Sequence, residues 1–429
     1  MNILVFTRSA WDDTNSVGNT MTNLFNGYDK NEIANLYLRS ATPQNEVCEK
    51  YYSISDFDVI KGIINWNFKP GKYFEFNETA TKNVDNKKEE LTYGYFRGKN
   101  SVVGHRLQEL IWGLGTWKNS NIDAFLDEFK PEVIFSPCFN AIHAHKLLQY
   151  VQKRTNAKVV LFHADDYLTK QSFTGNFLER LDKSARATTI LKTVELSSLN
   201  YCISDKQKEE YSKIINKNIK ILYKGADFSV VKPTYHYAAG SKIRVVYIGS
   251  TLYGRWRTLA LLAKAMAKIN SENEIFELNI YSQYQPEAEA LAAMQIRGTS
   301  QFLGSVPSTE VATLMKNADI VLHVESFERG ERLKTRLSFS TKIVDCLHSG
   351  RCIMAIGGEE AASIDYLVKE DAAMVAFDEE MIEKNLRAIV KDPELLNEYS
   401  TKAWTCGVRN HQIQTIQTNL YRDFEKLLE

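Results

Sequence analysis

The strongest constraint on this chain is an alternation, found twice along it, of short apolar runs with amphipathic stretches of helical length. Continuous apolar runs of this length are typical of strands buried on both faces, with helices covering a parallel sheet. The expected strands of the first series are 3–6, 33–38, 133–136, 159–162, 200–203 and 219–223, and those of the second are 244–249, 276–281, 320–324, 353–356 and 373–375. The sequence therefore predicts an α/β protein with two doubly wound parallel sheets.

Length agrees with two domains, because a single core rarely grows beyond about 250–300 residues and this chain has 429. The segment 227–242 contains Pro233 and Gly240 and no helical periodicity, so we expect it to be the linker. We place the first domain at 1–235 and the second at 236–406. Residues 65–100, with several glycines and a polar run, predict an irregular excursion from the first domain.

Composition argues against several classes of protein. The 53 basic and 53 acidic residues balance, so nothing indicates a nucleic-acid partner. The six cysteines show no metal-type spacing and are expected to be reduced thiols, without a metal site. No run of 18 apolar residues occurs and the N-terminal run is too short for a signal peptide, so we expect a cytoplasmic protein with at most a peripheral contact to the inner face of the membrane.

One helical stripe allows two interpretations. Leu107, Leu110, Ile111, Leu114 and Trp117 recur at helical spacing and fit either a lipid-facing surface or the protein core. Because such stripes are more often structural, we predict that this one is core.

The segment 338–351 is the clearest candidate binding site. Small hydroxyl residues and Lys342 open a helix that Gly350 ends. Unpaired N–H groups at a helix start attract phosphate oxygens, Lys342 adds a positive charge, and Asp345 one turn later suits ribose hydroxyls. Ordinary capping of the helix by Ser338 and Ser340 is the alternative. The pattern predicts a nucleotide-diphosphate site formed by Phe339, Ser340, Thr341, Lys342 and Asp345.

A second candidate site follows the expected strand 244–249. Gly249 lets the chain turn close to a ligand, and Ser250 follows it at the carboxyl edge of the sheet, where ligands of such folds bind. Arg255 and Arg257 are two residues apart, so we expect only one of them to face the site and grip pyrophosphate oxygens. Alternatively, both arginines lie on a solvated helix start.

In the first half, His163, Asp165 and Asp166 directly follow a buried strand. Polar titratable groups at the carboxyl end of a strand point into a ligand site. Either aspartate could orient His163 or hold acceptor hydroxyls, and the sequence does not choose between them. We assign His163 and Asp165 to catalysis and Asp166 to acceptor binding.

Three motifs occur in order along the second half of the chain: 201–205 with 221–227, 245–250 with 255–259, and 302–307 with 314–324 and 340–350. Together they resemble the donor domain of GT-B-fold glycosyltransferases, closest in pattern to the retaining glycosyltransferase family 4 (glycosyl transferases group 1). The resemblance implies two Rossmann-like domains facing across a cleft, with 407–429 forming a C-terminal helix that crosses back to the first domain.

The resemblance also implies an activity. A hexosyltransferase of this kind moves a sugar from a nucleotide-diphosphate sugar to the hydroxyl of a glycan, a lipid-linked or a small-molecule acceptor, with retention of configuration, in polysaccharide or glycoconjugate assembly. His163 resembles the family's histidine that contacts the donor sugar, and Arg257 and Lys342 would act on the leaving group. Gly18 and Asn19 lie where the family keeps an acceptor loop, with a plain helix start as the alternative. No metal or other cofactor is implied.

The chain departs from the family at two positions. Leu337 stands where a glutamate usually lies, eight residues before the acidic residue of the donor helix, and that acidic residue is Asp345 instead of glutamate. Two alternatives therefore stay open: a nucleotide-sugar 2-epimerase of the same fold, and a catalytically silent nucleotide-sugar-binding partner subunit.

Overall fold

The chain forms two compact units. The computed structural model describes residues 1–13, 16–39, 41–45, 47–76, 102–235, 237–238 and 240–429. Unit 1 comprises Met1–Ile203, Lys208–Leu222 and Gln417–Glu429, and unit 2 comprises Ser204–Gln207 and Tyr223–Ile416. The domain bounds expected from sequence, 1–235, 236–406 and 407–429, stay a prediction.

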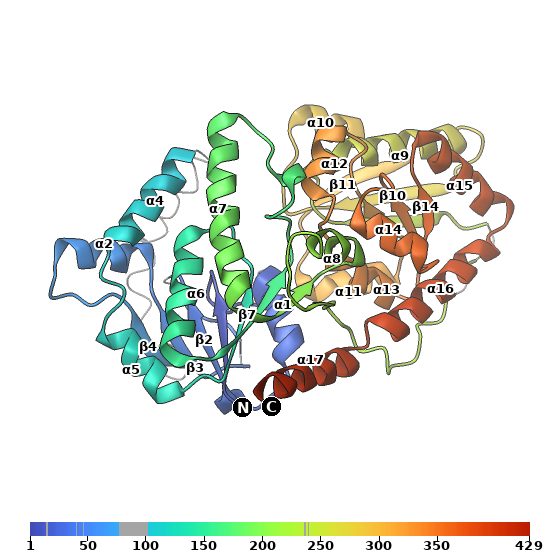
Figure 1. The fold of residues 1–429 in the computed structure, drawn as a ribbon. Helices are drawn as coiled ribbons and strands as arrows, with labels where there is room; N and C mark the ends of the chain where they lie inside the picture. Colours follow the sequence, from blue (N-terminus) through green and yellow to red (C-terminus); the bar gives the residue numbers. More distant parts are fainter. Residues whose placement is uncertain (14–15, 40, 46, 77–101, 236, 239) are drawn as a thin grey trace. The chain divides into compact units, whose positions relative to one another are not determined.

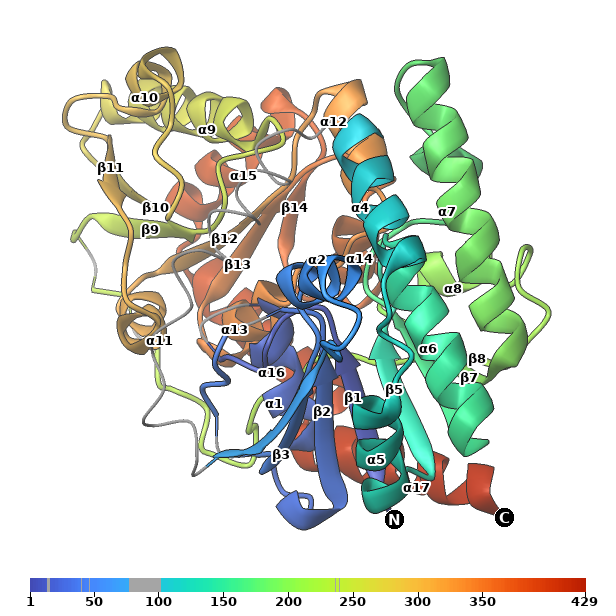
Figure 2. The ribbon, with the colours of Figure 1, turned by 90° about the vertical axis from the view of Figure 1, so that its left-hand side faces the viewer.

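Unit 1 is built on an eight-stranded sheet with the order β4-β3-β2-β1-β5-β6-β7-β8. All neighbouring strands pair in parallel except β3 and β4, which are antiparallel. The strands are β1 (Ile3–Thr7), β2 (Ile33–Tyr37), β3 (Lys50–Ser53), β4 (Lys72–Glu75), β5 (Val133–Pro137), β6 (Lys158–His163), β7 (Ser197–Cys202) and β8 (Ile219–Ile221). The central strands β1, β2 and β5 are fully buried, because helices cover both faces of the sheet (Figure 2).

The helices of unit 1 follow the alternation that the sequence predicts. They are α1 (Ser16–Phe25), α2 (Asp56–Ile64), α4 (Val102–Leu114), α5 (Ser120–Phe129), α6 (Ile142–Thr155), α7 (Phe177–Leu196) and α8 (Asp205–Tyr211), with short 3-10 turns at Lys30–Glu32 and Lys170–Ser172. The last helix, α17 (Ile413–Leu428), belongs to unit 1 from Gln417 onward (Figure 1). Its Phe424 is fully buried against the rings of Phe25 and Phe135.

Two short strands of unit 1, β3 and β4, are absent from the sequence prediction. β3 reads Lys-Tyr-Tyr-Ser, which is not an apolar run, yet Tyr51 and Tyr52 are fully buried. Tyr51 stacks on Phe74 of β4 at 5.5 Å, so the two strands are held by aromatic packing between distant segments. Within the predicted irregular excursion at 65–100, the described residues 65–76 contain the edge strand β4, and 77–100 lie outside the described residues, so the excursion stays a prediction.

The prediction that the stripe on 107–117 is core is wrong for three of its members. Leu107, Leu110 and Leu114 are exposed, whereas Trp117 is buried. The buried face of α4 carries Gln108 and Trp112, which both donate hydrogen bonds to the carboxylate of Asp56 in α2. These hydrogen bonds to Asp56 thus determine which face of α4 is buried, and hydropathy alone does not predict that face.

Unit 2 has a six-stranded, entirely parallel sheet with the order β11-β10-β9-β12-β13-β14. The strands are β9 (Ile243–Ile248), β10 (Phe276–Tyr281), β11 (Ser300–Gly304), β12 (Ile320–Val324), β13 (Cys352–Ile356) and β14 (Met374–Ala376). The helices are α9 (Arg255–Asn270), α10 (Ala288–Met294), α11 (Ser308–Lys316), α12 (Arg329–Thr335), α13 (Lys342–His348), α14 (Ala362–Lys369), α15 (Glu379–Lys391) and α16 (Glu394–Asn410). The predicted architecture of two parallel-sheet α/β domains is confirmed.

The order of the strands in unit 2 decides where a ligand site can form. After β9, the chain adds β10 and β11 on one side of this strand. It then adds β12, β13 and β14 on the other side. Loops at the carboxyl ends of strands diverge at such a switch point and leave room for a ligand.

Among the described residues, no helix is both long and apolar enough to cross a membrane.

Candidate functional site

The candidate donor site lies at the carboxyl edge of the unit 2 sheet. Gly249 follows β9 and Glu325 follows β12, so both come to the same edge. A Cβ atom on Gly249 would lie 2.5 Å from the hydroxyl oxygen of Tyr247, and only glycine fits there. That hydroxyl donates to the carbonyl oxygen of Ser250 at 2.7 Å and fixes the turn.

Lys342 and Asp345 lie on the first turn of α13, as the sequence predicts. Lys224, which precedes unit 2's first strand, places its ammonium 3.7 Å from an Asp345 carboxylate oxygen. The surrounding protein desolvates both α13 groups, which raises the pKa of Asp345 and lowers the pKa of Lys342. The positive charges of Lys224 and Lys342 work against this rise in the pKa of Asp345.

The start of α13 is held by its own backbone and by an aromatic cluster. The N–H groups of Ile343 and Val344 donate to the carbonyl oxygens of Ser340 and Thr341, and the Thr341 side chain makes no capping bond. Phe339 is buried, with its ring 5.4 Å from that of Tyr223 and 5.1 Å from that of Tyr366. Phe339 therefore anchors this helix start from the protein interior, and only its backbone is placed to contact a ligand.

The two arginines of α9 have different environments. Arg255 donates through Nη2 to both carboxylate oxygens of Glu325 at 2.9 Å, and through Nε to the carbonyl oxygen of Val324. Burial works against the charge, but Glu325 raises the pKa of Arg255 above its usual value. The charge of Arg255 also acts on Lys342 and lowers its pKa. Arg255 is thus an arginine held by Glu325 and Val324 whose charge acts on Lys342 of α13.

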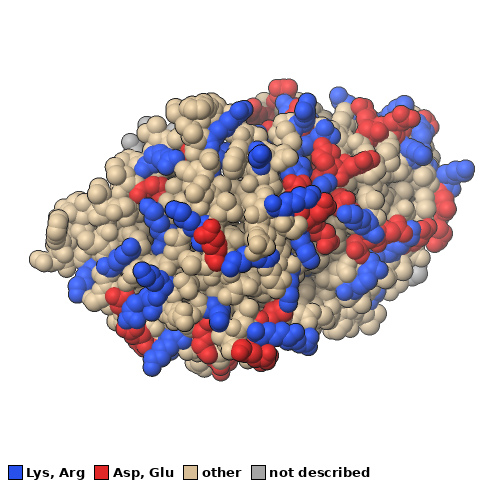
Figure 3. Space-filling view, viewed as in Figure 1, with Lys and Arg blue, Asp and Glu red and all other residues tan. Residues whose placement is uncertain are grey.

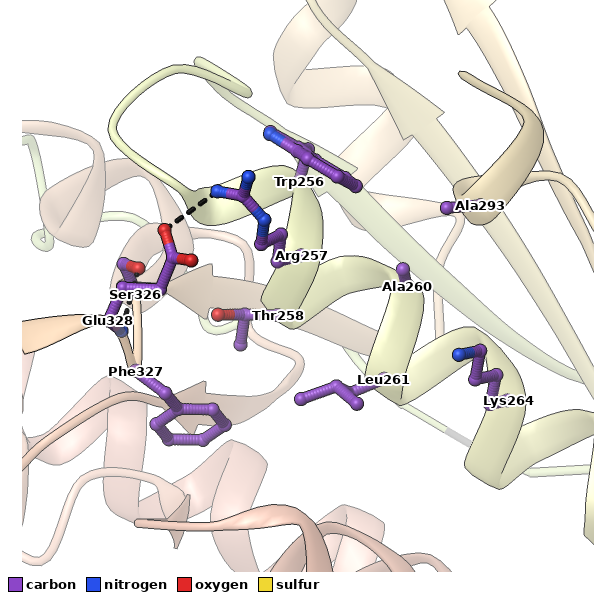
Figure 4. Close-up of a pocket in the computed structure, with 10 residues that line it drawn as sticks. All are labelled: Trp256, Arg257, Thr258, Ala260, Leu261, Lys264, Ala293, Ser326, Phe327 and Glu328. Atoms are coloured by element: carbon purple, nitrogen blue, oxygen red, sulfur yellow. Dashed lines mark hydrogen bonds and ion pairs between the residues drawn. The ribbon is translucent and has the colours of Figure 1, made fainter. Parts of the chain in front are cut away.

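Arg257 instead lines a separate hollow of about 350 Å³ (Figure 4). Its guanidinium lies 4.4 Å from the centre of the Trp256 ring and pairs with the exposed carboxylate of Glu328 at 2.7 Å. Leu261 and Phe327 form the apolar wall of the hollow. Neither Lys342 nor Asp345 lines this hollow, so the structure does not bring Arg257 together with the other predicted donor residues.

The candidate catalytic residue of unit 1, His163, ends β6 and is fully buried. Its Nε2 lies 3.1 Å from Oδ1 of Asn200, whose Nδ2 donates to Ser197 Oγ, and Ser197 donates to Val194 O. This chain of bonds makes Asn200 Oδ1 an acceptor, so Nε2 of His163 carries the proton. Burial lowers the pKa of His163 to about 4, and its Nδ1 is a buried acceptor without a hydrogen-bond donor.

The two aspartates after β6 hold the loop that follows. Asp166 Oδ1 accepts from the backbone N–H groups of Leu168 and Thr169 and from the Tyr211 hydroxyl. Asp165 is exposed and accepts from the Tyr167 hydroxyl at 3.1 Å. The group that orients His163 is Asn200 and neither aspartate.

Gly18 and Asn19 lie in the first turns of α1, as expected from the sequence. A Cβ atom on Gly18 would lie 2.0 Å from the backbone oxygen of Asp12, so the position needs glycine for close backbone approach. Asn19 is exposed. The packing of Gly18 explains its identity without a ligand, and the acceptor role of both residues stays a prediction.

The sequence analysis missed three residues that the structure connects to the predicted ones: Lys224, Glu325 and Asn200. Glu325 directly follows a buried strand, so the same rule that singled out His163 also applies to it. Lys224 and Asn200 carried no such signal, because their partners are 121 and 37 residues away in the chain. Within the described residues, no three His, Cys, Asp or Glu side chains gather closely enough to hold a metal ion.

Comparison with known proteins addresses the second unit directly. Residues 242–392 match the family model described as glycosyl transferases group 1. Unit 2 contains a glycosyl transferases group 1 domain. This match includes the Gly249 turn, both arginines and the α13 helix start with Lys342 and Asp345.

Solved structures share the fold over nearly the whole chain. Anabaena HepE in complex with UDP has a TM-score of 0.66 at 10% identity, covering 99% of this chain and 100% of that one. Sucrose-phosphate synthase from Thermosynechococcus elongatus has a TM-score of 0.64 at 10% identity, covering 100% of this chain and 99% of that one. The α,α-trehalose-phosphate synthase (UDP-forming) from Burkholderia vietnamiensis has a TM-score of 0.61 at 8% identity, covering 99% of this chain and 100% of that one. No curated protein sequence gives a significant match.

These findings confirm two predictions. The fold is the GT-B fold, and the group 1 domain marks the chain as a glycosyltransferase. At such low identity the solved structures show the fold alone, so the roles of individual residues rest on the contacts described above.

Proposed function

We propose that this chain transfers a sugar from a nucleotide-diphosphate sugar to an acceptor hydroxyl, with retention of configuration, as a hexosyltransferase. The observation that carries the proposal is the group of charges at the carboxyl edge of the unit 2 sheet. Lys224, Lys342 and Arg255 carry three positive charges there, against two negative charges on Asp345 and Glu325. The excess of positive charge suits a diphosphate that gains negative charge as it leaves.

Each member of this group has a separate task in the proposal. Lys342, whose pKa is lowered by burial, meets the phosphate oxygens at the start of α13. Arg255 is fixed on one edge by Glu325 and Val324, so the other edge of its guanidinium is oriented for the same diphosphate. Asp345 accepts hydrogen bonds from the ribose hydroxyls, with the ammonium of Lys224 3.7 Å from its carboxylate. Gly249 and Ser250 form the turn beside them.

In unit 1, we propose that His163 positions the donor sugar as a neutral imidazole. Its unpaired Nδ1 accepts a hydrogen bond from a sugar hydroxyl, which would satisfy a buried polar atom. Retention needs no protein nucleophile in this scheme, because the leaving phosphate takes the proton from the acceptor hydroxyl on the same face. Asp165 would take part near the reacting centre. Gly18, Asn19 and Asp166 would border the acceptor, which is a glycan, a lipid-linked or a small-molecule hydroxyl compound.

The first test concerns the donor. Several structures of the same fold hold UDP or UDP-glucose, so we propose a UDP-sugar and test it against GDP- and ADP-sugars by thermal shift. A ligand that binds only the folded state raises the melting temperature by mass action. Lys342→Ala should abolish the shift, and Lys334→Ala, which removes an exposed lysine paired with Glu331, should keep it. If Lys342→Ala responds like the parent, the phosphate site is assigned wrongly.

The second test concerns the reaction. The preferred donor and a panel of acceptors should give a glycosylated product whose anomeric configuration, read by nuclear magnetic resonance, equals that of the donor. We also propose that no metal is needed, so EDTA should leave the rate unchanged. Loss of activity in EDTA, with recovery on adding a divalent cation, would contradict that part of the proposal.

One observation favours a second candidate, a nucleotide-sugar binder without catalytic activity. Leu337 is buried at the position where the resemblance expects a glutamate near the donor sugar, so no carboxylate is supplied from there. A thermal shift with the donor but no transfer or hydrolysis would establish this candidate. Conversion of the donor alone to its 2-epimer would instead establish the isomerase.

For the place of action, we propose the cytoplasm. All six cysteines, which lie in the described residues, are unpaired and buried. Fractionation of cells that express the chain, followed by immunoblotting, measures the location.

A further inference from the structure

Two helices of unit 1, α4 and α7, present apolar side chains to solvent. On α4, the outward positions are Val103, Leu107, Leu110 and Leu114, with Val103 75% and Leu110 57% exposed. On the first turns of α7, they are Phe177, Leu178 and Leu181, with Phe177 73% and Leu178 63% exposed. We call these seven residues the apolar face. Exposed apolar groups of this size mark an interaction surface more often than a plain solvent boundary.

The two helices are fastened to each other beside the apolar face. Arg106 of α4 pairs with Asp182 of α7 at 2.9 Å, and His105 contacts Arg186 of α7 at 2.8 Å. Leu107 and Leu181 are the direct chain neighbours of that first ion pair. In Figure 1, α4 and α7 begin on the same side of unit 1.

Basic side chains are exposed near the apolar face, and one of them, Arg106, is paired with Asp182. Arg106, Lys170 and Arg180 are exposed. The acidic residues of the same segments are used internally: Asp182 pairs with Arg106 and Arg186, Glu179 caps α7 through Asn176, and Glu109 bonds to His143. In Figure 3 the surface over the upper ends of α4 and α7 is mostly tan, with blue atoms near it.

We propose that the apolar face docks on a phospholipid bilayer that carries anionic headgroups. Bulky apolar side chains at a helix end insert below the headgroups, and flanking Arg and Lys residues gain from the negative surface potential. A second copy of the chain is the alternative occupant, and the test below separates it from a bilayer. This surface is distinct from the donor site, and the inference adds to the proposed transfer reaction without depending on it.

The test uses sedimentation with phosphatidylcholine vesicles, with or without phosphatidylglycerol. The parent chain should sediment with the anionic vesicles and stay in solution with the neutral ones. The double variant Phe177→Ser with Leu178→Ser should reduce the bound fraction at least about tenfold, since it removes two of the most exposed apolar groups. Val231→Ser, at an apolar residue of unit 2 that is 91% exposed, is the matched control and should bind like the parent.

A charge variant keeps the test independent of hydrophobic packing. Arg180→Glu should weaken binding to anionic vesicles by a smaller factor, and raising the salt concentration should remove the difference. Unchanged melting temperatures of all variants, and unchanged transfer to a water-soluble acceptor, separate this inference from the proposed function. Absence of vesicle binding by the parent, equal binding by the double variant, or a dimer in solution that the double variant abolishes would each overturn it.

Discussion

The two units differ in how their predicted functional residues are held. In unit 2, Lys342 and Asp345 come from one short helix start, and the sequence-local motif and the structure agree on their position. In unit 1, His163, Asp166 and Gly18 are each tied into the fold by contacts with other segments. The comparison teaches that the residues of the predicted phosphate site follow from one local motif, whereas those of the predicted sugar and acceptor sites depend on distant partners.

The largest expected effect concerns the ion pairs that Arg255 and Arg257 of α9 form with glutamates. Removing each glutamate tests whether Arg255 belongs to the predicted donor site and Arg257 to the surface. Glu325→Ala should lower the free energy of unfolding by about 3–5 kcal/mol, because it leaves the Arg255 charge buried without its partner. Glu328→Ala removes the exposed partner of Arg257 and should cost less than about 1 kcal/mol. Urea denaturation measures both values. Equal losses would remove the distinction between the two arginines.

The next effect separates the tasks of the two units. Lys342→Ala should lower the transfer rate at least about 100-fold, or about 2.7 kcal/mol, and abolish the thermal shift with UDP, because Lys342 is placed on the diphosphate. His163→Phe should lower kcat about tenfold and leave the UDP shift intact, because His163 is placed on the sugar. Loss of the UDP shift in His163→Phe would merge the two tasks and break the comparison.

A smaller effect tests whether Gly18 serves packing. Gly18→Ala should destabilise the chain by about 1–3 kcal/mol, because the new Cβ collides with the Asp12 backbone. Gly113→Ala, at a helix position of the same unit where a Cβ meets open space, should stabilise it by up to about 1 kcal/mol. Thermal denaturation compares the two. An unchanged melting temperature for Gly18→Ala, with weaker acceptor binding, would favour a ligand role instead.

The smallest expected effect is the loss of stability in acid, which we expect to be similar in the two units. Burial lowers the pKa of His145 in unit 1 to about 4 and that of His323 in unit 2 to about 3. The unfolded chain binds protons below a pKa of about 6.5, so each histidine contributes stability that is lost as pH falls from that value toward the folded pKa.

The measurement is the free energy of unfolding at pH 7.5 and at pH 5.5. His145→Gln and His323→Gln should each reduce the loss between these two pH values by about 1.4 kcal/mol, whatever their effect at pH 7.5. A reduction in only one of the two variants would show that acid acts on one unit.

The alternation of apolar runs and helices was enough to predict both parallel sheets. Hydropathy periodicity depends on residues that are close together in the chain, and so does secondary structure. The predicted phosphate-site pattern around α13 is local in the same way. Hydropathy periodicity was not enough for β3 and β4, which form by pairing with each other and by the stacking of Tyr51 on Phe74.

What the tertiary structure decided is which partner each candidate has. Only the fold brings Asn200 to His163, Glu325 to Arg255 and Lys224 to Asp345, because these pairs are separated by 37 to 121 residues. It also decided that the stripe on α4 faces solvent, since Gln108 and Trp112 bind Asp56 and turn that helix. By itself the sequence determined the sheets and the diphosphate motif, which depend on neighbouring residues. Orientation, burial and charge pairing depend on segments far apart in the chain, and so only the folded molecule set them.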